Sequence, residues 1–304
     1  LFRAHFALIR NPLFTSYGLN TSALFGFINQ ILKIKKDENP DYFACAFDSK
    51  GKTFRHKMYE EYKANRPPMP DELQQQLPHL WEILDAMNVP VLKKNGVEAD
   101  DIIGTLAVRA QNEGLDTYIV SGDKDFMQLI NENIFLYAPG TKKSPNPIIY
   151  DSKKVEDKWG VPPEKIIDLL GLMGDSSDNV PGVSGVGEKT AVKLIKEYGS
   201  LDGALENADQ VSNKRARTGL KEGAENARLS QDLVTIMLDV EISSSLDDFI
   251  SAKMNNSLCI EKFHELEFQA FVKQFQEENS NPVVVTKDQK KDYNTVLTLS
   301  LIHI

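Results

Sequence analysis

Four short acidic clusters carry the strongest chemical signal in this sequence. Each lies beside apolar residues at the end of an expected strand or helix: Asp48 after YFACAF; Glu98, Asp100 and Asp101 in GVEADD; Asp123 and Asp125 in SGDKD; Asp175 and Asp178 in GDSSD. Aspartate also favours helix caps and turns, so any one cluster alone has an equally good structural explanation. Two carboxylates ~4 Å apart repel by roughly 4 kcal/mol at an effective dielectric constant near 20, so clusters that meet need cations.

The candidate ligands are all oxygen atoms, whereas the five histidines are scattered through the chain. Hard oxygen ligands select Mg²⁺ or Mn²⁺ over Zn²⁺. A site holding two or more such ions suits the hydrolysis of a phosphodiester, because one metal generates hydroxide and the pair stabilises the attacking and leaving oxygens. No serine or cysteine nucleophile is indicated.

A basic stretch, SKGKTFRHKMYEEYKANRPPMP (49–70), separates the first two acidic clusters. It carries six basic residues within 17 positions and interleaved aromatic rings: Lys50, Lys52, Arg55, Lys57, Lys63 and Arg66, with Phe54, Tyr59 and Tyr62. Charge for phosphates and rings for bases are what single-stranded nucleic acid requires. A solvated helix face balanced by Glu60 and Glu61 explains the spacing equally well. A second basic run, NKRARTGLK (213–221), is a weaker signal that is better explained as an exposed loop or helix face.

The glycine-rich turn GVSGVGEKT (182–190) has two interpretations. A P-loop needs lysine directly after its last glycine, but Glu188 intervenes, and the turn follows the helical run IIDLLGLMG instead of a strand. The alternative is a hairpin between two helices. Its free amides and the next helix N-terminus would hold a backbone phosphate, with Lys189 adding charge. Such contacts grip a duplex without reading its sequence.

The elements that must position these residues alternate between strand and helix. Strands are expected at 42–48, 117–123 and 133–137, and helices at 72–88 and 99–114, so we predict an α/β fold with a parallel sheet. Parallel sheets bind ligands at the carboxyl ends of their strands, where two of the acidic clusters lie. From about residue 162 the pattern is nearly all helical.

Composition narrows the possible partners and compartment. The net charge of −9 excludes nucleic-acid binding through overall attraction, so any such binding must use local basic patches. The sequence contains no apolar run long enough to span a membrane, and we expect no membrane partner. Cys45 and Cys259 form no spacing motif, which predicts a reducing cytoplasm.

Taken together and in this order, the motifs resemble the 5′-nuclease domain of bacterial DNA polymerase I, of the flap endonuclease superfamily. The matching segments run from residue 1 to about 270: AFDSKGKTFRHKMYEEYKANRPPMP, GVEADDIIGTLA, SGDKDFMQL and KWGVPPEKIIDLLGLMGDSSDNVPGVSGVGEKTA. The resemblance implies a PIN-like core over 1–160 with a helical arch at about 49–70. It implies a helical subdomain over 161–275 with a helix–hairpin–helix at about 180–200. Residues 276–304 are expected to be a linker, followed by the start of another domain or a foreign tail.

The resemblance also assigns roles to residues. All eight carboxylates of the four clusters match metal ligands, and the catalytic group is expected to be Lys63, Arg66, Asp100 and Asp123. The residues expected to contact DNA are Arg55, Tyr62, Lys63, Arg66, Gly185, Gly187, Lys189 and Thr190. A bound K⁺ at the hairpin is a further expectation.

The implied activity is removal of 5′ flaps and RNA primers at single-strand/duplex junctions, as part of DNA polymerase I in the bacterial cytoplasm at the nucleoid. The partners would be junction DNA, RNA primer–DNA hybrids and the polymerase domain of the same parent chain. In the family a strand ending in Asp-Gly precedes the helix that LFRAHFAL resembles, so we expect an N-terminally truncated fragment. Two alternatives stay open: a DNA-binding fragment without catalysis, and a PIN-type ribonuclease.

Overall fold

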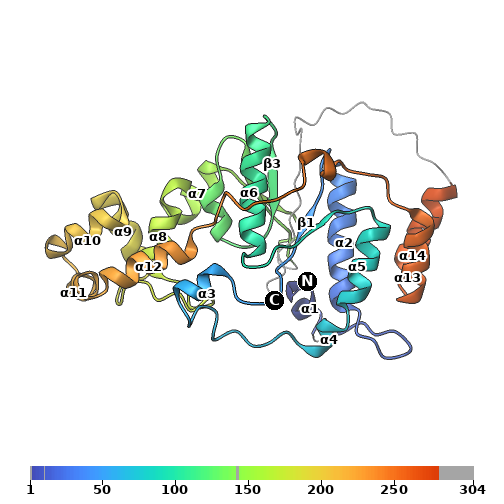
Figure 1. The fold of residues 1–304 in the computed structure, drawn as a ribbon, viewed down its shortest axis with the longest axis horizontal. Coiled ribbons are helices and arrows are strands. Elements are labelled where there is room, and N and C mark those ends of the chain that lie inside the picture. The colour runs from blue at the N-terminus through green and yellow to red at the C-terminus, as the bar shows by residue number, and fades with distance from the viewer. Residues whose placement is uncertain (1, 10, 142–143, 281–304) are drawn as a thin grey trace.

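The computed structural model describes residues 2–9, 11–141 and 144–280. Helices α8 to α12 gather at one end of an elongated molecule, and α2, α5, α13 and α14 at the other, with the strands and α6 between them (Figure 1). The linker and tail were expected over 276–304, but residues 276–280 belong to helix α14 (Gln269–Ser280), and the rest of that segment lies outside the described residues. The described part has no helix that is both long and apolar enough to cross a membrane.

The strands form two small sheets among the described residues. Strand β1 (Cys45–Ala46) pairs in parallel with β2 (Val91–Leu92), and β3 (Thr117–Val120) pairs in parallel with β4 (Ile134–Ala138). Strand β5 (Ile148–Tyr150) joins β4 antiparallel, which the short connection between them permits. The three strands expected from the sequence are present, the first two shorter than expected, and β2 and the antiparallel β5 accompany them.

The helices of the first 160 residues surround these sheets. Their bounds are α1 (Phe2–Ala7), α2 (Ser22–Asp37), α3 (Phe54–Met58), α4 (Asp71–Gln74), α5 (Leu77–Ala86), α6 (Ala99–Asn112), the 3₁₀ helix η1 (Asp125–Leu129) and α7 (Ser152–Trp159). The expected helix at 72–88 is interrupted before α5, which begins with a proline in its first turn, where the missing amide costs nothing. The basic stretch 49–70 contains only the short helix α3, followed by turns.

The second half is helical, as expected. It contains η2 (Pro163–Lys165), α8 (Ile166–Met173), α9 (Glu188–Tyr198), α10 (Leu201–Glu206), η3 (Ala208–Gln210), α11 (Lys214–Glu222) and α12 (Ala224–Val234). The glycine-rich turn connects α8 to α9. Its two arms touch: a Cβ on Gly182 would lie 2.5 Å from Gly174 N, so only glycine permits this approach.

The last helices leave this group and return to the opposite end. After η4 (Leu246–Phe249), α13 (Asn256–Glu265) and α14 (Gln269–Ser280) pack beside α2 and α5, where Phe271 stacks on Phe25. Their buried aromatic side chains belong to the same core as α2 and α5, separate from the core that contains α8 to α12. The expected subdomain 161–275 therefore packs as two parts, because the apolar faces of α13 and α14 are buried against the N-terminal core.

Candidate active site and DNA-binding surfaces

Five acidic residues from three of the four clusters line one narrow pocket. Its volume is about 10 Å³, room for one water-sized sphere, and its acidic lining is Glu98, Asp100, Asp123, Asp125 and Asp178. The first two residues come from the start of α6, the next two follow β3, and the last lies in the loop after α8. Acidic residues up to 80 positions apart in the chain thus converge, as their places at strand ends and helix starts predicted. Their convergence concentrates negative charge in one pocket.

The start of α6 is held in place by its own acidic residues. Glu98 is the N-cap, and its backbone amide donates to Asp101 Oδ2 at 2.9 Å in a capping box. Asp48, just past β1, accepts the Ala99 amide at 2.7 Å. Negative groups are favourable here because the helix N-terminus carries partial positive charge. The carboxylate of Asp48 therefore binds the backbone of Ala99, between the pocket residues Glu98 and Asp100.

Asp101 is turned away from the pocket into a buried network. It is fully buried and forms a bidentate ion pair with Arg55, with both N–O distances 2.8 Å. Arg55 is also buried, and it donates to the Leu233 and Thr235 carbonyls. The Met237 amide donates to Asp101 Oδ1. Because these groups are satisfied internally, we do not carry Asp101 into the proposed metal set or Arg55 into the proposed DNA contacts.

Three residues of the stretch expected to form the arch, Tyr62, Lys63 and Arg66, contact acidic residues of the pocket. Lys63 Nζ lies 2.6 Å from Glu98 Oε1 and 3.6 Å from Asp178 Oδ2, and Arg66 forms an ion pair with Asp178. Tyr62 Oη donates to Glu98 at 3.1 Å. Burial lowers the pKa of Lys63, but the neighbouring Glu98 and Asp178 charges outweigh it and raise that pKa. Lys63 thus stays cationic beside the pocket, and its backbone, with a left-handed φ of +58°, donates a hydrogen bond to the Asp178 carbonyl.

A lysine that the sequence analysis did not single out neutralises the fourth cluster. Lys124, between Asp123 and Asp125 in SGDKD, contacts Asp175 Oδ2 at 2.6 Å. This pairing outweighs burial and lowers the pKa of Asp175. A lysine flanked by two aspartates was the signal in the sequence. The ion pair between Lys124 and Asp175 holds the loop after α8 against the end of β3.

Asp125 is the most perturbed carboxyl group of the pocket. Burial, followed by the charge of Asp123, raises its pKa to about 8. Its amide donates to Asp123 Oδ1 at 3.1 Å, and its own Oδ1 is buried without a hydrogen-bond partner among the described residues. A buried oxygen without a donor is costly, and a cation would satisfy it.

The donor set fits a hard divalent cation chemically, since the acidic pocket offers oxygen ligands and one buried carboxylate oxygen that has no donor. Within residues 2–9, 11–141 and 144–280, no three His, Cys, Asp or Glu side chains are grouped closely enough to hold a metal ion. Side-chain cations occupy the equivalent positions, with Lys63, Arg66 and Lys124 paired to the carboxylates. A metal would therefore take over charges that these residues now neutralise.

The glycine hairpin lies away from this pocket, at the start of α9. Gly187 is the N-cap, and its carbonyl accepts the Thr190 and Ala191 amides. The Glu188 and Lys189 amides lie in the first turn of α9, where backbone amides have no intrahelical acceptor. Gly187 and Lys189 are exposed, Thr190 is half-buried, and a Cβ on Gly187 would meet nothing within 4 Å. The open side of the hairpin thus presents amides and one lysine.

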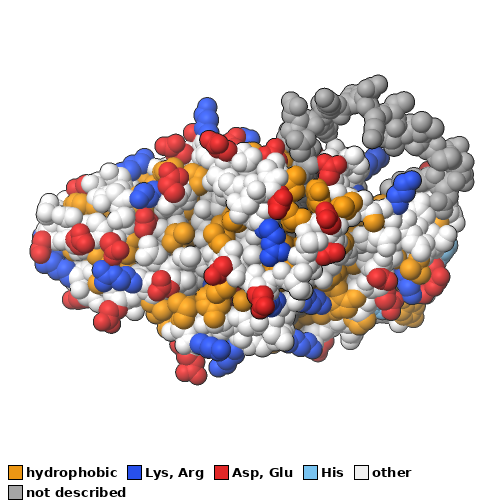
Figure 2. Space-filling view, turned by 45° about the horizontal axis from the view of Figure 1, so that its top comes forward, with side chains coloured by type: hydrophobic (Ala, Val, Ile, Leu, Met, Phe, Trp, Pro, Cys, Tyr) orange, Lys and Arg blue, Asp and Glu red, His pale blue; other side chains and the backbone are white. Residues whose placement is uncertain are grey.

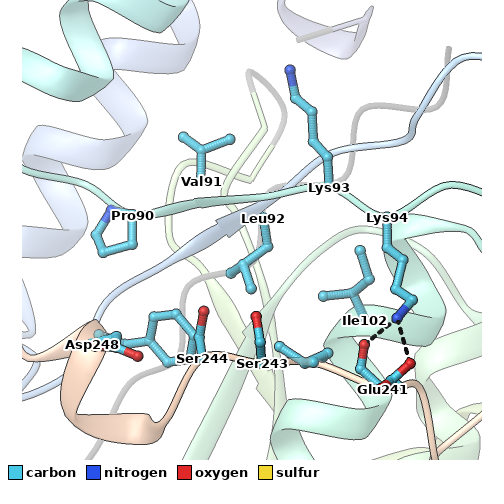
Figure 3. A pocket seen from close by; sticks show the side chains of 12 residues that line it. Pro90, Val91, Leu92, Lys93, Lys94, Ile102, Glu241, Ser243, Ser244 and Asp248 are labelled. Atoms are coloured by element: carbon cyan, nitrogen blue, oxygen red, sulfur yellow. Dashed lines mark hydrogen bonds and ion pairs between the residues drawn. The ribbon is translucent and has the colours of Figure 1, made fainter.

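A larger cleft of about 320 Å³ lies elsewhere, between β2 and the segment 241–249 (Figure 3). Leu92 and Ile102 face it, and Lys94 spans one end to reach Glu241 at 3.6 Å. Its size exceeds that of the acidic pocket, but it has no converging carboxylates. The acidic pocket is therefore the better candidate for chemistry.

Comparison with known proteins identifies the family. Residues 1–160 match the 5′-3′ exonuclease N-terminal resolvase-like domain, and residues 161–257 match the 5′-3′ exonuclease C-terminal SAM fold. The chain belongs to the 5′-3′ exonuclease family. This exonuclease-family chain is 37% identical to a 5′-3′ exonuclease of Aquifex aeolicus over 90% of its own length and 91% of that protein.

Longer relatives share the same region. The chain is 42% identical to DNA polymerase I of Caldicellulosiruptor bescii, and 40% identical to that of Bacillus subtilis. These matches cover 90% and 92% of the chain, but only 32% and 31% of the relatives. The exonuclease-family chain thus spans about a third of the length of these polymerases, which confirms the resemblance that its motifs predicted.

Solved structures confirm the fold class, a PIN-like α/β core followed by a mostly helical part. T5 5′-exonuclease with bound zinc aligns with a TM-score of 0.58 at 20% identity, over 83% of this chain and 89% of that one. The catalytic core of Rad2 in complex with DNA aligns with a TM-score of 0.55 at 17% identity, over 83% of each chain. At these identities the likeness concerns the fold alone.

Proposed function

We propose that this chain is a divalent-metal-dependent, structure-specific 5′ nuclease that cuts DNA at single-strand/duplex junctions. The observation that carries the proposal is the pocket in which five carboxylates from three chain segments meet two arch cations. The 5′-3′ exonuclease name of the Aquifex aeolicus relative, similar in length, supports the same activity.

In this proposal the metal site is formed by the acidic pocket with Asp48 and Asp175 beside it. Bound Mg²⁺ or Mn²⁺, two or more ions, supply the hydroxide and stabilise charge on the phosphodiester. Asp100 and Asp123, from the α6 start and the end of β3, hold the centre of the site. The metal-bound T5 5′-exonuclease structures support a divalent ion in this fold.

The arch cations have a different task. Lys63 and Arg66 pair with Glu98 and Asp178, and they would be free to pair with the scissile phosphate if those two carboxylates held a metal ion. A cation placed where charge develops stabilises the transition state. Tyr62, which is buried beside them, orients this segment through its hydrogen bond to Glu98.

Structure selection would come from the hairpin, where Gly185, Gly187, Lys189 and Thr190 hold a duplex phosphate and the adjacent carbonyls hold K⁺. We propose RNA primer–DNA hybrids as further substrates and the polymerase domain of a longer parent chain as a partner. The setting would be the bacterial cytoplasm, at the nucleoid. The DNA polymerase I relatives, which are about three times as long as the matched region, support the polymerase domain as a partner.

A non-catalytic DNA-binding role is the less favoured alternative, because the relative of similar length is named an exonuclease. A PIN-type ribonuclease is the other. The glycine hairpin counts against it, because an RNA cleaver of that type has no need of a duplex grip. Comparing cleavage of single-stranded RNA and flap DNA separates the three possibilities.

The test is cleavage of a labelled 5′-flap duplex in Mg²⁺ by wild type and by Asp123→Ala/Asp125→Ala. We expect the double variant to lose activity while it still binds the flap in Ca²⁺. The matched control, Asp202→Ala/Asp209→Ala, removes two exposed aspartates from the helical part and should cut normally. Full-rate cleavage by the pocket variant would refute the site assignment.

A further inference from the structure

Helix α11 carries the second basic run, which the proposed function has not yet used. Its first turn exposes Lys214 and Arg215, whereas Ala216, Gly219 and Leu220 on the other face are buried. The apolar face packs into the same core as Val183 and Val186 of the hairpin. The basic residues are thus fixed relative to the hairpin by a well-packed interface, as a rigid binding surface requires.

The contact between α11 and the hairpin is close enough to depend on glycine. A Cβ on Gly219 would lie 2.0 Å from Ser184 O and 3.2 Å from Val183 Cγ1, so any larger residue would push the helix away. Figure 1 shows α11 at the same end of the molecule as α9, which begins directly after the hairpin. The two helices thus flank the hairpin.

Arg215 lies across the hairpin itself. A Cβ on Gly185 would lie 2.5 Å from Arg215 Cγ and 3.1 Å from its Nε, and Gly185 has a φ of +81°. The space that Gly185 leaves open is therefore filled by the stem of Arg215, whereas the space over Gly187 is open. Gly185 serves the placement of an arginine next to the open side of the hairpin.

The cations around this hairpin are free. Lys189, Lys214 and Arg215 are exposed and form no ion pair within the described part of the chain. Elsewhere in the same helices, Lys221 is paired with Asp209. In a chain of net charge −9, whose face in Figure 2 mixes acidic and basic side chains throughout, a set of unpaired cations beside open amides is a local anion-binding surface.

We propose that Lys214 and Arg215 of α11 form a second contact with duplex DNA, holding backbone phosphates next to those held by the hairpin and α9. The inference deepens the proposed function and rests on it, since it names the duplex as the occupant. The contribution comes from side-chain charge, because Asn213 already accepts the Arg215 and Ala216 amides at this helix start. Such contacts position the duplex without reading its sequence.

The experiment measures binding of a fluorescent blunt duplex by anisotropy between about 50 and 200 mM KCl. Each lost phosphate contact lowers the salt slope by about 0.9, so Lys214→Gln/Arg215→Gln should lower its magnitude by about 2. Lys221→Gln, on the same helix but paired with Asp209, is the matched control and should leave the slope unchanged. Arg215→Lys keeps the charge and should retain the wild-type slope.

Two readouts separate this surface from the active site. The double variant should raise KM for a flap substrate without lowering kcat, and it should bind single-stranded DNA as tightly as wild type. An unchanged duplex slope, or an equal loss for Lys221→Gln, would overturn the proposal. If wild type bound the duplex with this slope but failed to cut flaps, the nuclease proposal would fail and the α11 surface would stand. Should the double variant melt early, Lys214→Gln alone, which removes an exposed side chain, is expected to lower the slope by about 1.

Discussion

Replacing Arg55 by methionine tests whether this residue stabilises the fold or contacts DNA. The side chain is 2% exposed and pairs with fully buried Asp101 through two bonds of 2.8 Å. Methionine keeps much of the volume but leaves a buried carboxylate without a countercharge, and it removes the donors to the Leu233 and Thr235 carbonyls. The contacts of Arg55 connect α3 to α6 and to the end of α12 with the segment after it.

Removing one partner of a buried ion pair costs about 3–5 kcal/mol, because the other charge stays desolvated. For a chain of this size we expect Arg55→Met to lower the melting temperature by on the order of 10 °C. Asp101→Asn should destabilise the protein similarly. Because the two residues share one interaction, the double variant should be more stable than the sum of the single losses predicts, by up to about 3 kcal/mol.

The assay is urea unfolding followed by circular dichroism for the four proteins of this cycle. Lys221→Met, which removes one member of an exposed pair, is the control and should change the free energy of unfolding by less than about 1 kcal/mol. An Arg55→Met protein that keeps wild-type stability but loses DNA affinity would refute this reasoning and would return Arg55 to the DNA-contact set.

Three further predictions follow from the same geometry. The raised pKa of Asp125, about 8, keeps that carboxyl group protonated at neutral pH, so Mg²⁺ binding should release a proton and should tighten as pH rises through 8. Calorimetry in two buffers of different ionisation enthalpy measures this proton release, and equal binding heats in the two buffers would contradict it. Lys63→Ala should lower kcat by ~10²-fold, whereas Lys189→Ala should leave kcat unchanged and lower the salt slope of duplex binding by about 1. Stopped-flow cleavage measures the first effect and anisotropy the second, and the same defect in both variants would contradict these separate roles. Gly219→Ala should destabilise the protein by about 1–3 kcal/mol because its Cβ meets Ser184 O, whereas Gly187→Ala should not; a stable Gly219→Ala protein in thermal melts would mean that α11 is not docked as described.

The sequence correctly predicted several of the strands and helices, and it predicted that the site is acidic. Strand positions at 117–123 and 133–137, the helix at 99–114 and the all-helical second half followed from local periodicity, which depends on neighbouring residues only. Oxygen ligands grouped at strand ends and helix starts likewise predicted an acidic site. These features depend on residues close together in the chain, so the amino-acid sequence alone was enough to predict them.

Tertiary structure decided which members of each group do which work. Asp100 and Asp101 are adjacent in sequence, but successive helix residues are turned by about 100°, so Asp100 lines the pocket and Asp101 pairs with Arg55 behind it. Lys63 and Arg55 lie in one basic stretch, but the chain turns between them after α3, so Lys63 pairs with Glu98 whereas Arg55 pairs with buried Asp101.

Long-range packing also decided what no local pattern could. Helices α13 and α14 return to the N-terminal core, and α11 docks on the hairpin through Gly219, because distant apolar faces exclude water only where complementary surfaces meet. The sequence determined that this chain has carboxylates for cations, a basic stretch and a glycine hairpin. Which charges are paired, which are buried and which remain free for a ligand depended on contacts between distant residues, such as Arg55 and Thr235, 180 positions apart, and such contacts exist only in the folded chain.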